Sequence, residues 1–107
     1  MQDFRNLLVW QKAHRLALET YRITNDFPRD EVFGLRNMMR RTSIDIPAYI
    51  AEGAVKPNDT EFARSISAAL GFANRLEYYA LMAHDPGGFL SGRFMAAMRA
   101  SWLRLRN

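Results

Sequence analysis

Apolar residues recur at three- and four-residue spacing along most of this 107-residue chain, which is the period of amphipathic helices. No segment shows the apolar-polar alternation of a strand. Proline- or glycine-containing stretches separate the periodic segments. The pattern therefore predicts an all-α fold in one domain, residues 1–107, built as an antiparallel up-down-up-down four-helix bundle. The expected helices are 7–25, about 29–53, from a cap at 58–60 to about 84, and about 89–105.

The first two predicted helices carry apolar residues on two sides. In the first, Val9, Leu16 and Ile23 lie apart from the longer stripe, which consists of Trp10, Ala13, His14, Ala17, Tyr21 and Thr24. In the second, Phe33, Ile44 and Ala51 lie roughly opposite the main stripe. A surface helix normally buries a single face of about 100°. This pattern favours contact with another subunit, but neighbouring helices of the same bundle are an alternative cover.

The second predicted helix contains Pro47, which lacks a backbone donor and crowds the carbonyl of Ser43. Because the apolar period continues through this position, it predicts one kinked helix instead of two. The Ser43 hydroxyl is a candidate to satisfy the disturbed turn. Gly53 marks the expected stop.

Charged residues around this bend are interpreted as a structural ion network. Arg41 and Asp45 have the i,i+4 spacing of an ion pair, and Glu77 falls on the apolar stripe of the third helix. We expect a buried or semi-buried network at the bend. A catalytic role for Glu52 and Glu77 as an acid–base pair is the weaker alternative. The predicted members are Arg40, Arg41, Asp45, Glu52 and Glu77.

Other chemistry is not supported by the residues present. The chain has no cysteine, and neither His14 nor His84 belongs to the Glu-x-x-His motif of a di-metal bundle. It has no glycine-rich phosphate loop and no nucleophile elbow. We therefore expect no enzyme activity, no cofactor and no metal. The sequence shows neither a signal peptide nor a membrane-length apolar run, so a cytoplasmic location without a membrane partner is expected.

The formal net charge is +4, and the stretch 86–107 holds four arginines and no acidic residue. A basic excess attracts nucleic acid, although a solvated helix face is the alternative interpretation. The aromatic residues are interpreted as packing groups in preference to base-stacking platforms. The candidate phosphate contacts are Arg93, Arg99, Arg104, Arg106, Arg36 and Lys12.

Several stretches together resemble the four-helix-bundle proteins encoded within intervening sequences of bacterial 23S rRNA genes, also called S23 ribosomal proteins. The resemblance covers roughly residues 4–80. The chain departs from that family's pattern at Tyr49 and Phe72, where asparagine and serine are usual, and at Asp45. The matching pieces are Phe4 with 7–13, Tyr21, Phe27-Pro28, Glu31, 33–35, Arg40-Arg41, Ser43-Ile44, 46–48, 50–53, Glu61-Phe62, Gly71 and Glu77.

The resemblance implies a ring-shaped homopentamer with no enzymatic activity. A relative, the accessory variability protein of diversity-generating retroelements, is similar in fold and binds both a reverse transcriptase and nucleic acid. Two hypotheses follow: an oligomer that binds RNA or other nucleic acid, or a scaffold that docks a protein such as a reverse transcriptase. A passenger protein without a strong partner is the third possibility.

Overall fold

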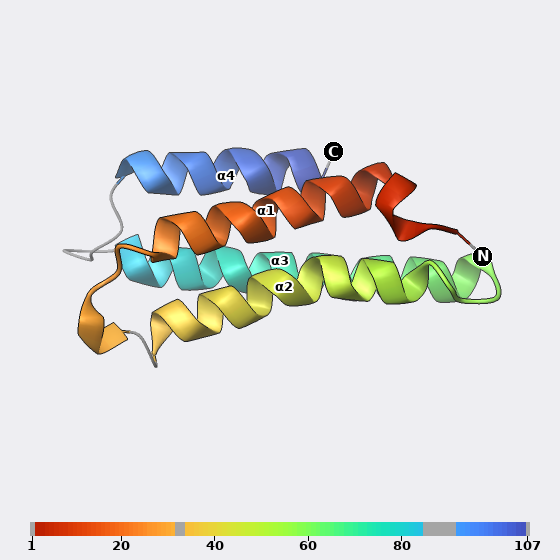
Figure 1. The fold of residues 1–107 in the computed structure, drawn as a ribbon, viewed down its shortest axis with the longest axis horizontal. Helices are drawn as coiled ribbons and strands as arrows, with labels where there is room; N and C mark the ends of the chain where they lie inside the picture. Colours follow the sequence, from red (N-terminus) through yellow and green to blue (C-terminus); the bar gives the residue numbers. More distant parts are fainter. Residues whose placement is uncertain (1, 32–33, 85–91, 107) are drawn as a thin grey trace.

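Four α-helices account for most of the structure, a computed structural model that describes residues 2–31, 34–84 and 92–106. Figure 1 shows them running alternately in opposite directions. In the described residues α1 and α3 each pack against α2 and α4, so every helix has two neighbours around the bundle. These ranges contain no strand, and the predicted all-α four-helix architecture is confirmed. The elements are η1 (Phe4–Asn6), α1 (Leu8–Thr24), η2 (Arg29–Glu31), α2 (Leu35–Gly53), α3 (Asp59–His84) and α4 (Gly92–Arg106).

The start of α2 differs from the prediction. The helix begins at Leu35, and the residues near Arg29 form only the short turn η2. Glu31 folds back so that its Oε1 accepts a hydrogen bond from the Leu35 N–H at 3.1 Å. A carboxylate is stabilising there because the amino end of a helix carries partial positive charge. Acidic residues were expected at this helix start, but the intervening break at Gly34 was not.

The start of α3 follows the expected capping chemistry. Of the three candidate caps, Asn58 is the one that acts: its Oδ1 accepts a hydrogen bond from the Glu61 N–H at 2.9 Å. Residues 85–88 of the turn predicted over residues 84–88, and the first predicted residues of the last helix, lie outside the described residues, as does Phe33.

Helix α2 passes through Pro47 without a break, so the prediction of one helix instead of two is confirmed. Its first half is inclined to its second half in Figure 1. Pro47 is buried, and the Ser43 hydroxyl, fully buried one turn earlier, donates to the Arg40 carbonyl at 2.8 Å. Thus Ser43 has a hydrogen-bond partner beside the turn that Pro47 disturbs.

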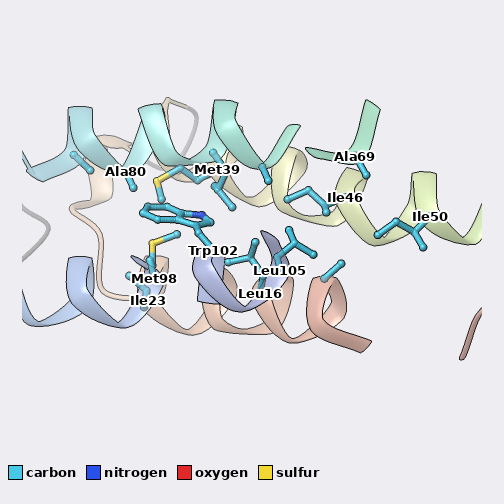
Figure 2. Close-up of a cluster of buried hydrophobic side chains, with 14 of the residues drawn as sticks. Leu16, Ile23, Met39, Ile46, Ile50, Ala69, Ala80, Met98, Trp102 and Leu105 are labelled. Carbon is cyan, nitrogen blue, oxygen red and sulfur yellow. The ribbon is translucent and has the colours of Figure 1, made fainter. Parts of the chain in front are cut away.

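The core is centred on Trp102, whose side chain is 1% exposed. Figure 2 shows this ring among buried side chains, with Met39 of α2 and Met98 of its own helix α4 close to it. Thioether sulfur makes favourable contacts with aromatic rings. The Trp102 Nε1–H has no hydrogen-bond partner in the described residues. An unpaired buried donor costs about 1–3 kcal/mol, which the burial of so large a ring offsets.

Gly53, predicted as a helix stop, has a second role in packing. It is the last residue of α2 and is buried against α3. A Cβ placed on Gly53 would lie 2.6 Å from the Ser65 Cβ and 3.2 Å from Phe62 Cδ1. Because a Cβ cannot rotate away, any larger residue would push the two helices apart. Gly71 of α3 is the opposite case, since a Cβ there would meet nothing within 4 Å.

These two glycines give a matched test. Gly53→Ala is expected to lower the free energy of unfolding by about 1–3 kcal/mol, the cost of overpacking. Gly71→Ala is expected to raise it by about 0.5–1 kcal/mol through helix propensity. Urea unfolding at one protein concentration measures both. Equal effects of the two substitutions would contradict the close approach of α2 and α3 at Gly53.

Candidate functional site

Arg40 joins α2 to the end of α1. Its Nε donates to Thr24 Oγ1 at 2.8 Å and its Nη2 donates to the Tyr21 carbonyl at 3.0 Å. Its guanidinium carbon lies 4.6 Å from the centre of the Tyr21 ring, within cation–π distance. The last carbonyls of a helix lack intrahelical donors and carry partial negative charge. Arg40 therefore acts as a cationic cap on the carboxyl end of α1.

The arginine is held by neutral groups and not by a carboxylate. Burial lowers the pKa of the Arg40 guanidinium, the nearby charge of Arg36 lowers it further, and Tyr21 acts in the opposite direction. Arginine remains charged after such shifts because its ordinary pKa is so high. The hydroxyl of Thr24, which is fully buried, donates to the Thr20 carbonyl at 2.7 Å while it accepts from Arg40. The polar groups at this contact are thereby paired.

The structure does not show the predicted ion network around the bend. The ion pairs that it shows among the described residues are Asp3–Arg5, Glu19–Arg22 and Glu61–Arg64, and none of them contains Arg40, Arg41, Asp45 or Glu52. Arg41 and Glu52 are exposed, while Asp45 and Glu77 are half-buried in two different pockets. A solvent-exposed ion pair at i,i+4 spacing contributes so little free energy that the spacing alone does not hold the two side chains together. Nothing brings the two glutamates together as an acid–base pair.

A mostly apolar groove with a volume of about 410 Å³ lies between α1 and α2. Leu18 and Ile44 on its walls are 58% and 45% exposed, which is unusual for large aliphatic side chains. Trp10 and His14 stack at one place along it, with ring centres 4.8 Å apart. The groove is lined by Trp10, His14, Ala17, Leu18, Tyr21, Ile44, Pro47, Ala48 and Ala51.

This groove explains the two-sided pattern of the first two helices. Leu16 and Ile23 of the second stripe on α1 are buried inside the bundle. The longer stripe divides: Ala13 is buried inside, whereas Trp10 and Tyr21 turn to the groove. The α2 residues opposite the main stripe line the same groove. The bundle thus covers only part of the apolar surface of these helices. Sequence reasoning missed Leu18, which belongs to neither stripe.

The arginines of α4 lie on its outer side where they are described. Arg93, Arg99 and Arg104 are exposed, and α4 contains no acidic residue. Arg104 Nη2 donates to Ser101 Oγ at 2.9 Å, which restrains one of these guanidinium groups. Arg99 lines a pocket of about 390 Å³ with Glu77 of α3, so a carboxylate lies near one of the three.

The remaining candidate phosphate contacts lie elsewhere. Lys12 is half-buried on α1, and Arg36 is half-buried on α2 near Arg40. Helix α2 is not a neighbour of α4 around the bundle in the described residues, so Arg36 is not part of the α4 surface. The side chain of Arg106 lies outside the described residues.

A polar cleft between α2 and α3 was not predicted. It has a volume of about 170 Å³ and brings Arg41 and Asp45 of α2 together with Arg75 of α3. On the same pair of helices, Tyr49 and Phe72 are in contact, with ring centres 5.1 Å apart. Tyr49 and Phe72 are two of the positions at which the sequence is expected to differ from the family pattern. Arg75 carried no signal in the sequence because its place depends on the register between the two helices.

The fold and these surfaces define a small helical-bundle protein with an open apolar groove and a basic outer helix. No group of three or more metal-ligating side chains is found in the part of the chain that the structure describes, and no helix there is long and apolar enough to cross a membrane. The family model described as 23S rRNA-intervening sequence protein matches residues 5–98, and the chain belongs to this family. The resemblance drawn from the sequence is confirmed. No curated protein matches the chain.

The two adjacent arginines provide a test of the contact at the end of α1. Arg40→Ala is expected to lower the free energy of unfolding by about 1–3 kcal/mol because it removes two hydrogen bonds from a charged donor and the contact with the Tyr21 ring. Arg40→Lys should recover only part of this loss, since an ammonium cannot reproduce the planar fork. Arg41→Ala is the control and should change stability by less than about 0.5 kcal/mol. If urea unfolding showed similar losses of unfolding free energy for both alanine variants, the two arginines would act together, as the predicted shared network requires.

Proposed function

We propose that this protein is a non-enzymatic, oligomeric four-helix bundle that binds RNA or other nucleic acid through arginines on its outer surface. The observation that carries this proposal is the charge of α4, where exposed Arg93, Arg99 and Arg104 have no acidic residue on the same helix. Phosphate contacts by arginine release counterions, which supplies affinity without sequence preference.

Assembly supports the proposal because each added subunit contributes another copy of a basic surface that would bind nucleic acid only weakly on its own. Each chain carries a net charge of +4, so five copies carry +20. Linked binding surfaces raise the overall affinity well above that of one copy. The pentamer is the state implied by the family resemblance, and the exposed apolar groove between α1 and α2 supports contact between subunits.

A protein-docking scaffold is the second candidate. The same apolar groove favours it, because an amphipathic helix of a partner protein would bury Leu18 and Ile44. A reverse transcriptase is one such partner if the expected relation to the accessory variability protein holds. Capture from the native host after nuclease treatment separates the candidates: a protein complex that survives favours the scaffold.

Salt-dependent filter binding tests the nucleic-acid proposal. Wild-type protein should bind structured RNA at about 50 mM salt and lose affinity steeply by about 200 mM. The variant Arg93→Ala/Arg99→Ala/Arg104→Ala should bind more weakly. Its salt dependence should be shallower by about one unit of slope for each arginine that pairs with a phosphate in the wild type.

The matched control removes the same charge elsewhere. Arg5, Arg29 and Arg64 are exposed residues of η1, η2 and α3, and their triple alanine variant should retain most of the affinity. An equal loss in both triple variants would show that net charge, and not the α4 surface, drives binding. No binding by the wild type at low salt would refute the proposal.

Light scattering tests assembly. The wild type should have about five times the chain mass of 12.4 kDa. Leu18→Glu and Ile44→Glu should each reduce this mass, since a charge in a buried contact between subunits is costly. Leu8→Glu is the control because Leu8 is 63% exposed and lies outside the groove. A wild-type monomer would show that the combined charge of several subunits does not contribute to nucleic-acid binding.

A further inference from the structure

The cleft between α2 and α3 gathers polar side chains in a small space. The cleft is lined by Arg41, Asp45 and Met38 of α2, by Arg75 and Tyr79 of α3, and by Thr42, which is only 7% exposed. The cleft volume of about 170 Å³ is enough for about five water molecules. The cleft is thus a polar site and not a gap in the core.

The polar groups of this cleft are not paired with one another. Among the described residues, Arg41, Thr42, Asp45 and Tyr79 have no side-chain hydrogen bond or ion pair to protein atoms. The guanidinium carbon of Arg75 lies 5.2 Å from the centre of the Phe72 ring. This ring is itself packed on Tyr49, so Arg75 rests on a fixed aromatic surface. The donors are in place, and the structure shows no hydrogen bond or ion pair between them and the Asp45 carboxylate.

The charge of the cleft selects its ligand. Two guanidinium groups and one carboxylate give a local charge of +1, which matches one singly charged anion. Arginine recognises phosphate oxygens with paired N–H donors, and the two hydroxyls add further donors. A phosphodiester carries one negative charge, whereas free phosphate carries about −1.5 to −2 at neutral pH and would be repelled more strongly by Asp45.

We propose that the α2–α3 cleft binds one phosphodiester group of a nucleic-acid backbone, held by Arg41 and Arg75, with Asp45 discriminating against doubly charged phosphate. This inference deepens the proposed function and rests on it for the biological ligand. It adds a contact point on a different pair of helices from the α4 arginines.

A dinucleotide tests the cleft alone, because it has a single phosphodiester. Uridylyl-uridine and inorganic phosphate are titrated separately into ¹⁵N-labelled protein, and the arginine Nε–Hε and backbone amide signals are followed by NMR. The dinucleotide should shift the signals of Arg41 and Arg75 and bind the wild type more tightly than inorganic phosphate does. The variant Arg41→Ala/Arg75→Ala should lose the shifts at Thr42 and Tyr79, while Arg29→Ala/Arg64→Ala should keep them.

Asp45→Asn provides a change that misfolding cannot mimic. Removing the carboxylate should raise the affinity for both probes and should reverse their order in favour of inorganic phosphate. In filter binding, the Arg41→Ala/Arg75→Ala variant should bind structured RNA about tenfold more weakly than the Arg29→Ala/Arg64→Ala control at low salt.

Three results would overturn the inference. They are no dinucleotide-dependent shift at Arg41 or Arg75, tighter binding of inorganic phosphate than of the dinucleotide by the wild type, and unchanged RNA affinity of the cleft variant. The dinucleotide result does not depend on the α4 arginines. Cleft shifts together with undiminished RNA binding by the α4 variant would refute the α4 surface alone, whereas RNA binding without cleft shifts would refute only the cleft.

Discussion

The arrangement of the bundle depends on the close approach of α2 and α3 at Gly53. The contact leaves no room for a Cβ, because Ser65 of α3 already occupies that space. Helix α2 is held against α3 here and must also pack against α1 along the side that contains Pro47. Farther along the same seam, the two helices present long polar side chains to each other instead of glycine and serine. The seam is therefore closed at Gly53 and open at Arg41, where the polar cleft lies.

The adjacent arginines show how one residue step on a helix separates two roles. Successive residues of a helix point about 100° apart, so Arg40 faces α1 while Arg41 faces the α3 side of α2. Arg40 meets the carboxyl end of α1, where a carbonyl group and a threonine hydroxyl satisfy its donors. Arg41 meets no such acceptor and stays exposed. The pair is thus a structural cap beside a charge available for binding.

Periodicity predicted the helices well, because burial repeats along each one: on α3, Ala69, Ala73, Leu76 and Ala80 recur at three- and four-residue spacing and are all buried. The periodicity did not predict the break before α2. Glu31 caps this helix from outside through a single local hydrogen bond, and such a bond leaves no periodic pattern in the sequence. The periodicity also did not predict the partners of Arg40. Charge pairing suggests a carboxylate, but the actual acceptors are Thr24 and a backbone carbonyl, which every residue possesses. Predicting the cleft would have required the register of α2 against α3, which is a property of the tertiary structure.

The positions of the groove and of α4 would allow the proposed assembly and the proposed nucleic-acid binding to occur together. The groove lies along the α1–α2 edge, while α4 lies beside α1 and α3 in the described residues. A subunit seated on the groove would therefore cover Leu18 and Ile44 while the outer side of α4 faced elsewhere. The same holds for the cleft, which lies on the α2–α3 edge. Because burial of apolar surface drives assembly and counterion release drives phosphate binding, salt should weaken the second far more than the first.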